Sequence, residues 1–347
     1  MPPRPPRGGG LAVVLGAGGA TGLAYTAGAL WAVEQATGLD LGAQADLVVG
    51  TSAGSIAAAY LRHGVRPREV AVMEPPEFTS PDPRRRRLLI PHDEGGFLTM
   101  RRVVGTAFDL THHLRRQPRR TPLSEALSRV FPSGMFSVTD ADWDHQGMPP
   151  VWPDRPLWIV TNDLDRLERV VLTAAATQHP PVTLHAALTA SMALPGLWPP
   201  VRVGWRRLYD GGMGHSTTHL DLAGQAGAAV VLGVTPFGMD PAEIERGVRV
   251  PAIRRAVVNQ TTREVHALRR AGVATMTLGP TSGEIAVVGR RILDRSLGVT
   301  VARRAYEATL RRLDAPPARE WIASARAAAA AAHPDLRRRT GEQFRRP

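Results

Sequence analysis

Short apolar runs alternate with helix-like stretches along this 347-residue chain, and that alternation most constrains its fold. Each run has the length of a buried strand, and helical periodicity fills the gaps between runs. The runs are residues 11–15, 46–49, 157–161, 169–173, 228–234 and 275–278. The helical stretches are residues 23–37, 53–62, 183–193, 217–226, 251–271 and 298–313. Strands that alternate with helices predict an α/β fold with three layers, α/β/α, around a mainly parallel sheet. Residues 201–208 predict an added antiparallel hairpin.

The second apolar run leads into Gly-Thr-Ser-Ala-Gly at residues 50–54, with Ser52 at its centre. A serine between a strand and a helix, with glycine two residues away on each side, is typical of a nucleophile elbow. Gly50 and Gly54 allow the tight turn that exposes the serine hydroxyl to an ester. A small-residue turn without chemistry has the same pattern, so the interpretation depends on two companion segments.

The first companion is a glycine-rich loop over residues 16–22, which follows the first apolar run and opens a helix. Backbone N–H groups at a helix N-terminus have no partner within the helix, and the helix dipole favours negative charge there. Parallel strands joined by one helix are neighbours, so the loop should lie beside Ser52 at the carboxyl edge of the sheet. Gly18 and Gly19 are therefore candidate donors to the oxyanion of an attacked ester.

The second companion is Asp210, which begins an Asp-Gly-Gly segment after the predicted hairpin. A serine hydroxyl needs a base to accept its proton, and a free aspartate, with a pKa of about 3.9, is weak at neutral pH. Apolar neighbours at residues 197–201, Trp205 and residues 208–209 predict a buried Asp210 with a raised pKa, suited to general-base work. An ordinary turn that begins with aspartate is the alternative.

These three segments, in this order, resemble the patatin-like phospholipase family over roughly residues 11–313, with further similarity at residues 161–165 and 190–196. The resemblance implies a serine hydrolase of lipid acyl esters that needs no cofactor or metal. It implies Ser52 as the nucleophile and Asp210 as the general base, a Ser-Asp dyad that forms an acyl-enzyme intermediate. The glycines that shape the motifs are Gly16, Gly22, Gly50, Gly54, Gly211 and Gly212.

One position departs from the family pattern: Thr21 stands where the family usually has arginine or lysine. Backbone donors survive this change, whereas any contribution of the cation to the loop or to the field at the site is lost. We therefore expect lower activity than the motifs alone suggest. A catalytically weak or inactive lipid-binding or scaffold protein on the same fold is an alternative, and transfer of the acyl group to another alcohol is not distinguished.

Two other enzyme classes share parts of this pattern. A dinucleotide-binding Rossmann protein has a similar first loop, but it expects an acidic residue about 20 positions later, at the end of the second strand, and none is there. A histidine-based hydrolase is the second alternative, with His215, His219 and His266 as candidate bases. Enzymes of that class carry the nucleophile elbow after several strands, whereas here only one helix separates the glycine-rich loop from the elbow. The adjacent histidines at 112–113 lack the spacing of metal ligands.

The net charge of +12 comes from arginine alone among the basic residues, since the chain has no lysine. Residues 84–120 hold ten arginines against three acidic residues, and residues 75–120 interrupt the strand–helix alternation. We expect this insertion to act as a lid over the active-site edge, where its basic amphipathic stretch packs on the core or contacts a membrane surface. No recognised nucleic-acid-binding motif accompanies the arginines, so we predict no nucleic-acid partner.

The remaining segments complete the predicted organisation. Residues 1–10 form a flexible leader, residues 11–313 the catalytic domain, and residues 314–347 an Ala-rich helix with a basic tail. The chain has no cysteine, which excludes disulfides and thiol chemistry. It also lacks an apolar stretch of about 18 residues. We predict a cytoplasmic protein that can be peripheral to the membrane, and the sequence leaves its oligomeric state open.

Overall fold

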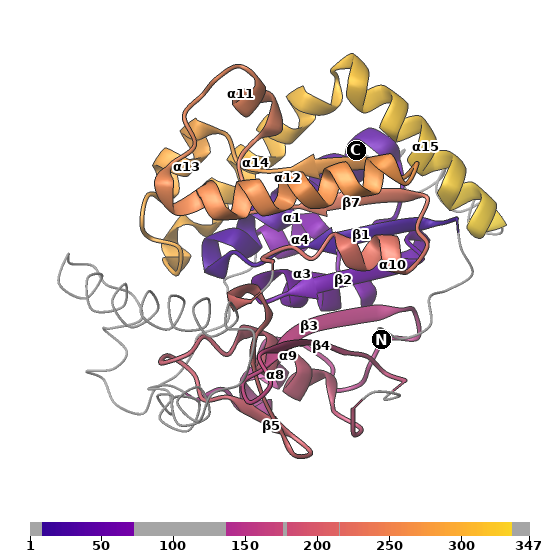
Figure 1. Cartoon of the computed structure of the whole chain (residues 1–347). Coiled ribbons are helices and arrows are strands. Elements are labelled where there is room, and N and C mark those ends of the chain that lie inside the picture. Colours follow the sequence, from indigo (N-terminus) through magenta and orange to yellow (C-terminus); the bar gives the residue numbers. More distant parts are fainter. Residues whose placement is uncertain (1–8, 73–136, 176–178, 215, 335–347) are drawn as a thin grey trace.

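The computed structural model describes residues 9–72, 137–175, 179–214 and 216–334 (Figure 1). The insertion expected at residues 75–120 and its basic face lie outside the described residues. So do most of the expected leader and the basic tail. The fold below therefore concerns the sheet and the helices that cover it.

A sheet of eight strands forms the centre of the described part, in the order β5-β6-β3-β2-β1-β7-β8, with β4 also paired to β3. The strands are β1 Leu11–Leu15, β2 Leu47–Thr51, β3 Leu157–Asp163, β4 Glu168–Leu172, β5 Val201–Val203, β6 Arg206–Asp210, β7 Val230–Val234 and β8 Ala274–Leu278. Strands β3, β2, β1, β7 and β8 pair in parallel, whereas the β3–β4, β3–β6 and β5–β6 pairs are antiparallel. The predicted mainly parallel sheet with an antiparallel hairpin is confirmed.

Helices cover both faces of the sheet. They are α1 Gly19–Thr37, α2 Leu41–Gln44, α3 Ala53–Arg62, α4 Pro67–Val72, α8 Asp140–His145, α9 Leu184–Met192, α10 Asp221–Gln225, α11 Pro241–Glu245, α12 Ala252–Arg270, α13 Ser282–Val288, α14 Gly298–Leu313 and α15 Pro316–Ala332. Figure 1 shows α10 and α12 in front of the sheet and α1 and α3 behind it. This arrangement confirms the three-layer α/β/α fold.

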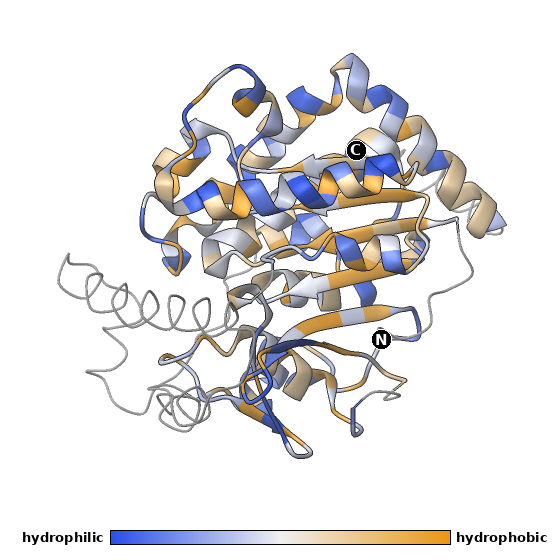
Figure 2. Cartoon of the chain, viewed as in Figure 1, coloured by the Kyte–Doolittle hydropathy of each residue, from blue (hydrophilic) through white to orange (hydrophobic). Residues whose placement is uncertain are grey.

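Two hydrophobic cores follow from the alternation of side chains along each strand. Leu11, Val13 and Leu15 of β1 point into the larger core, which they share with α1, α3, α9, α14 and α15. Ala12 and Val14 point to the other face and contact α10 and α12. Figure 2 shows the apolar strands enclosed between these layers, with hydrophilic residues along α12. Helix α15, which follows the expected catalytic domain, is thus part of the same core.

Two helices differ from their predicted bounds for local reasons. Helix α1 begins at Gly19, so the second half of the glycine-rich loop is its first turn. Helix α10 is confined to Asp221–Gln225, although residues 217–226 read as helical. The Ser216 hydroxyl accepts the N–H groups of Thr218 (3.1 Å) and His219 (3.0 Å), a local turn that competes with helix formation. His219 also has a positive φ of 62°, which a right-handed helix excludes.

Candidate active site

Strand β3 brings the carboxyl ends of β2 and β6 together. Strand β4 pairs with residues 159–163 and β2 pairs with residues 157–160, so these two strands lie on opposite edges of β3. Strand β6 pairs with residues 161–163, which β4 also occupies, so β6 lies on the edge that β2 uses. The two strands therefore meet end to end with opposite directions. Ser52 directly follows β2 and Asp210 ends β6, so this topology places the two residues at one point.

The turn over residues 50–54, the Ser52 turn, requires its two glycines. Ser52 has φ 53° and ψ −124°, a backbone conformation that residues with side chains rarely adopt. A Cβ atom on Gly50 would come within 2.5 Å of the Ser55 Cα atom. One on Gly54 would come within 2.2 Å of the Leu15 carbonyl oxygen. Only glycine fits at either position, and the side chain of Ser52 is left 7% exposed at the N-terminus of α3.

A second serine fixes the Ser52 turn to the sheet. The Ser52 N–H donates to the Ser191 hydroxyl (2.9 Å), which in turn donates to the Val160 carbonyl of β3 (2.7 Å). Ser191 is fully buried in α9. Because the Ser52 N–H is used in this way, it is not a donor for an oxyanion. Residues 190–196 resemble the family, but no pattern predicts this role for Ser191, which is one small polar residue among alanines in a helix.

Asp210 is the buried carboxyl group of the site, with 1% of its surface exposed. Burial raises its pKa to about 7, and interactions with the Ser52 hydroxyl and the Gly212 N–H oppose that rise. The Gly212 N–H donates to Oδ1 at 2.7 Å. Oδ2 is buried and has no hydrogen bond of regular geometry within the described residues, so the contact with Ser52 is longer or less well aligned. Such contacts often tighten only when substrate binds.

The apolar surroundings of Asp210 differ in one respect from the prediction. Leu208, Tyr209 and Trp198 are buried, as expected of residues that exclude water from a carboxyl group. Trp205, which the sequence placed among them, is instead 56% exposed at the tip of the β5–β6 hairpin. A two-residue turn at that position reverses the chain and carries the indole away from the end of β6, where Asp210 lies.

Groups from distant elements, one side chain and one backbone carbonyl, hold the backbone of the Asp210 segment, residues 210–212. The Asn162 amide donates to the carbonyl oxygens of Asp210 (2.7 Å) and Gly211 (3.0 Å). The Asp210 N–H donates to the Ala193 carbonyl after α9 (3.1 Å). Strand β3 and helix α9 thus hold the same segment that supplies the carboxyl group.

His219 supports the Gly211 carbonyl through a chain of polar groups. Arg169 can only donate, so its contact with His219 Nδ1 (3.2 Å) makes Nδ1 an acceptor and leaves the ring proton on Nε2. Nε2 then donates to the Gly211 carbonyl (3.1 Å). Asp221 holds Arg169 through two hydrogen bonds of 2.8 Å. The sequence suggests three histidines as candidate bases of a histidine-based hydrolase. Of these, His219 supports the Asp210 segment, His266 is exposed, and residue 215 lies outside the described residues.

The glycine-rich loop lies against both other motifs. A Cβ atom on Gly212 would come within 2.7 Å of the Ala17 Cβ atom. One on Gly54 would come within 2.6 Å of the Gly16 carbonyl oxygen. The loop, the Ser52 turn and the Asp210 segment are therefore in mutual contact at the carboxyl edge of the sheet.

The N–H groups of Gly18 and Gly19 are available in this loop. Gly18 is the residue before α1, and Gly19 has a positive φ of 64°. Neither N–H donates to a backbone or side-chain acceptor within the described residues. Of the other N–H groups in the loop, Gly16 donates to Val234 (2.9 Å), Ala17 to Thr217 (2.8 Å) and Thr21 to Ile292 (3.1 Å). The Ala20 N–H, like those of Gly18 and Gly19, donates to no acceptor within the described residues. The loop thus presents adjacent unused donors at the N-terminus of α1, among them the two predicted ones, and such donors can form an oxyanion hole.

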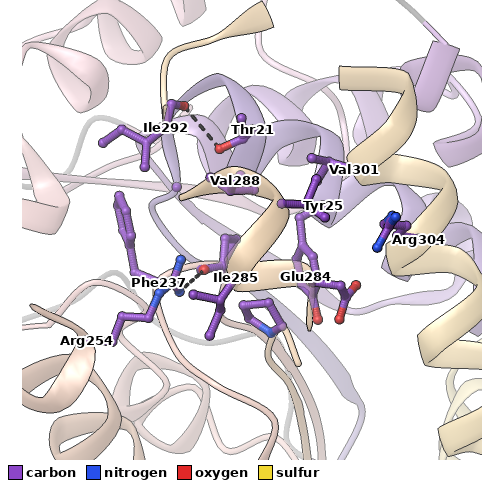
Figure 3. Close-up of a pocket in the computed structure, with 15 residues that line it drawn as sticks. Thr21, Tyr25, Phe237, Arg254, Glu284, Ile285, Val288, Ile292, Val301 and Arg304 are labelled. Atoms are coloured by element: carbon purple, nitrogen blue, oxygen red, sulfur yellow. Dashed lines mark hydrogen bonds between the residues drawn. The ribbon is translucent and has the colours of Figure 1, made fainter. Parts of the chain in front are cut away.

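Thr21, the position that departs from the family pattern, has its own partner. It is buried, and its hydroxyl and N–H both donate to the Ile292 carbonyl, at 3.2 and 3.1 Å. Figure 3 shows this contact between two of the residues that line a small cavity, which Gly18 and Arg254 also line. The cavity holds about 20 Å³, enough for one water molecule and too little for an acyl chain. Neither Ser52 nor Asp210 lines it, so it is not the substrate site.

In the described ranges, no three His, Asp or Glu side chains gather closely enough to hold a metal ion. No helix there is both long and apolar enough to cross a bilayer.

Comparison with known proteins places the chain in a family. A search of curated proteins finds no match. A family model, described as patatin-like phospholipase, matches residues 13–223. That range includes the glycine-rich loop, the Ser52 turn and the Asp210 segment. Since the match covers more than half of the 347 residues, the chain belongs to the patatin-like phospholipase family.

Proposed function

We propose that this protein is a serine hydrolase of lipid acyl esters in which Ser52 and Asp210 form a catalytic dyad. Family membership implies a lipid acyl hydrolase. The single observation that carries the finer proposal is the end-to-end meeting of β2 and β6, which puts a serine with a strained backbone beside a buried carboxyl group. Strain of this kind is concentrated at functional sites.

The reaction follows from these groups. Asp210 accepts the proton of the Ser52 hydroxyl while the hydroxyl oxygen attacks the ester carbonyl. The N–H groups of Gly18 and Gly19 stabilise the negative oxygen of the tetrahedral intermediate. Collapse breaks the bond to the leaving alcohol, which takes the proton from Asp210, and leaves an acyl group on Ser52. A water molecule, deprotonated by Asp210, then releases the fatty acid and restores the hydroxyl.

The raised pKa makes Asp210 a useful base. A free carboxylate with a pKa of about 3.9 has little proton affinity at neutral pH. With a pKa of about 7, Asp210 is about half ionised at pH 7 and binds a proton far more tightly when ionised. A general base is most effective when its pKa lies near the working pH. We expect glycerophospholipids or related acyl lipids as substrates.

Fluorophosphonate labelling of the purified protein tests this proposal, with the adduct located by intact mass and peptide mapping. We expect one adduct, on Ser52, that is absent from Ser52→Ala. Ser324→Ala is the matched control, because Ser324 is a half-buried serine of α15 far from the three motifs in sequence, and it should label like the parent. A folded parent protein without an adduct would instead favour the inactive lipid-binding alternative.

A further inference from the structure

The tip of the β5–β6 hairpin exposes a large aromatic side chain. Gly204, with φ 60°, and Trp205 form the turn between the two strands. Trp205 is 56% exposed. The other large hydrophobic side chains exposed in the described part are two valines, Val151 and Val299. An exposed tryptophan is costly in water, and tryptophan is enriched where proteins contact the interface of a membrane.

Two arginines hold this tryptophan in its exposed position. The guanidinium carbon of Arg166 lies 3.6 Å from the ring centre of Trp205, and that of Arg206 lies 4.6 Å from it. Both are cation–π contacts. Both arginines also form ion pairs with the fully buried Asp163, at 3.7 Å for Arg166 and 3.3 Å for Arg206. The indole is therefore braced before any partner binds.

A further arginine adds uncompensated positive charge to the hairpin. Arg202 and Arg207 are directly opposite each other on β5 and β6, and like charges at such positions are destabilising. Arg207 pairs with Asp165. Arg202 is exposed and has no ion pair within the described residues. Arginine binds phosphate groups through paired hydrogen bonds, so a phosphate-bearing partner would offset this repulsion.

The hairpin tip projects from the edge of the sheet that holds the candidate active site. Asp163, the last residue of β3, pairs with Leu208, so the turn at Trp205 lies beyond the carboxyl end of β3. Along β6, the four residue steps from Arg206 to Asp210 span roughly 14 Å. The same strand thus carries the exposed tip at one end and Asp210 at the other.

We propose that the hairpin surface, formed by Arg166, Arg202, Trp205 and Arg206, docks the protein on a phospholipid surface. Trp205 enters the interface between headgroups and acyl chains, Arg166 and Arg206 hold it in place, and Arg202 binds a headgroup phosphate. Docking there turns the carboxyl edge of the sheet toward the lipid, so that an acyl ester can reach Ser52. The proposal rests on the proposed function for its choice of partner.

Vesicle binding tests the docking surface without catalysis. The full-length Ser52→Ala protein is sedimented with vesicles of phosphatidylcholine and phosphatidylglycerol, and the bound fraction is measured. Adding Trp205→Ala should weaken binding on the order of tenfold, Arg202→Gln about fivefold, and Trp205→Tyr much less. The matched controls Val299→Ala and Arg263→Gln, at exposed positions of α14 and α12, should bind like the parent. Unchanged binding of Trp205→Ala would overturn the proposal, as would a parent that does not bind.

A comparison of two substrates separates this proposal from the proposed function. Trp205→Ala, with Ser52 intact, should hydrolyse a water-soluble short-chain ester at the parent rate and phospholipid vesicles about tenfold more slowly. An equal fall in the hydrolysis rate of both substrates would show that Trp205 acts on the candidate active site, and would contradict docking. A parent without esterase activity would refute the proposed function, while the vesicle-binding result would still decide the docking surface. A Trp205→Ala variant that changes only self-association would assign the tip to a contact between copies of the chain.

Discussion

The Ser52 turn and the Asp210 segment meet at one point, but different parts of the molecule hold them in place. The Ser52 turn owes its strained backbone to its own residues, since Gly50 and Gly54 permit it, and Ser191 of α9 then fixes the Ser52 N–H to β3. The Asp210 segment depends on side chains far away in sequence, namely Asn162 and His219. A local motif can therefore be recognised from sequence, whereas the support of its partner requires the fold.

The largest expected effect comes from a substitution inside the Ser52 turn, Gly54→Ala. Gly54→Ala would place a Cβ atom 2.2 Å from the Leu15 carbonyl oxygen, a clash with backbone that no side-chain movement relieves. We expect a loss on the order of 5 kcal/mol in the free energy of unfolding, measured by urea denaturation. Gly283→Ala is the matched control, because its Cβ atom would have no neighbour closer than 4.0 Å in helix α13, and it should be neutral or stabilising. Equal stability of the two variants would refute the local account.

The burial of Asp210 predicts how stability depends on pH. Its pKa is about 7 in the folded protein against 3.8 for the ordinary group, so the folded state binds more protons between these values and loses stability as pH rises. Above about pH 7 the cost is complete and on the order of 4 kcal/mol. Asp210→Asn removes it, so we expect the variant to gain stability relative to the parent between about pH 4 and pH 8 in denaturant titrations. A difference that does not change with pH would contradict a raised pKa.

A smaller effect is expected from the loss of His219, which supports the Asp210 segment from outside it. His219→Asn keeps a residue that tolerates positive φ but removes the link from Arg169 to the Gly211 carbonyl. We expect kcat to fall about tenfold with KM nearly unchanged, the cost of one lost hydrogen bond to the base's backbone. His266→Asn, at an exposed position of α12, should match the parent in steady-state kinetics. An unchanged kcat for His219→Asn would show that Asn162 and the strand pairing suffice.

The smallest effect concerns the glycine-rich loop. Thr21→Val removes the hydroxyl that donates to the Ile292 carbonyl and leaves the N–H contact in place. We expect a loss of about 1 kcal/mol in the free energy of unfolding. Thr262→Val, at an exposed position of α12, should change stability by only a few tenths of a kcal/mol. A Thr21 variant as stable as this control would show that the N–H contact alone holds the loop.

The sequence predicted the fold well because its signals are local. Apolar runs at residues 11–15 and 157–161 became β1 and most of β3, since buried parallel strands need continuous apolar residues. The helix expected at residues 217–226 forms only over its second half, Asp221–Gln225, because the Ser216 hydroxyl and the positive φ of His219 prevent an earlier start. These features have no periodicity from which to predict them.

Only the motif residues of the candidate site were predicted, because their signals are also local. Glycine spacing and motif order identify Ser52 and Asp210 as candidates, but a single polar residue in an apolar helix or strand carries no pattern. The supporting roles of Ser191, Asn162 and His219 were missed on that account. Ser191 and Asn162 lie in segments that resemble the family, and His219 was considered only as a base. Trp205 was misplaced, because composition alone does not distinguish a residue at a hairpin tip from one beside a buried carboxyl group.

The most direct test of the dyad is the pH dependence of fluorophosphonate labelling of Ser52 in the parent and in Asp210→Asn. In the parent, the labelling rate should rise with pH and level off above an apparent pKa near 7, because only the ionised carboxyl accepts the serine proton. In Asp210→Asn the rate should fall by at least about a thousandfold and lose this dependence. A variant that labels Ser52 as fast as the parent, with the same pH profile, would contradict Asp210 as the base.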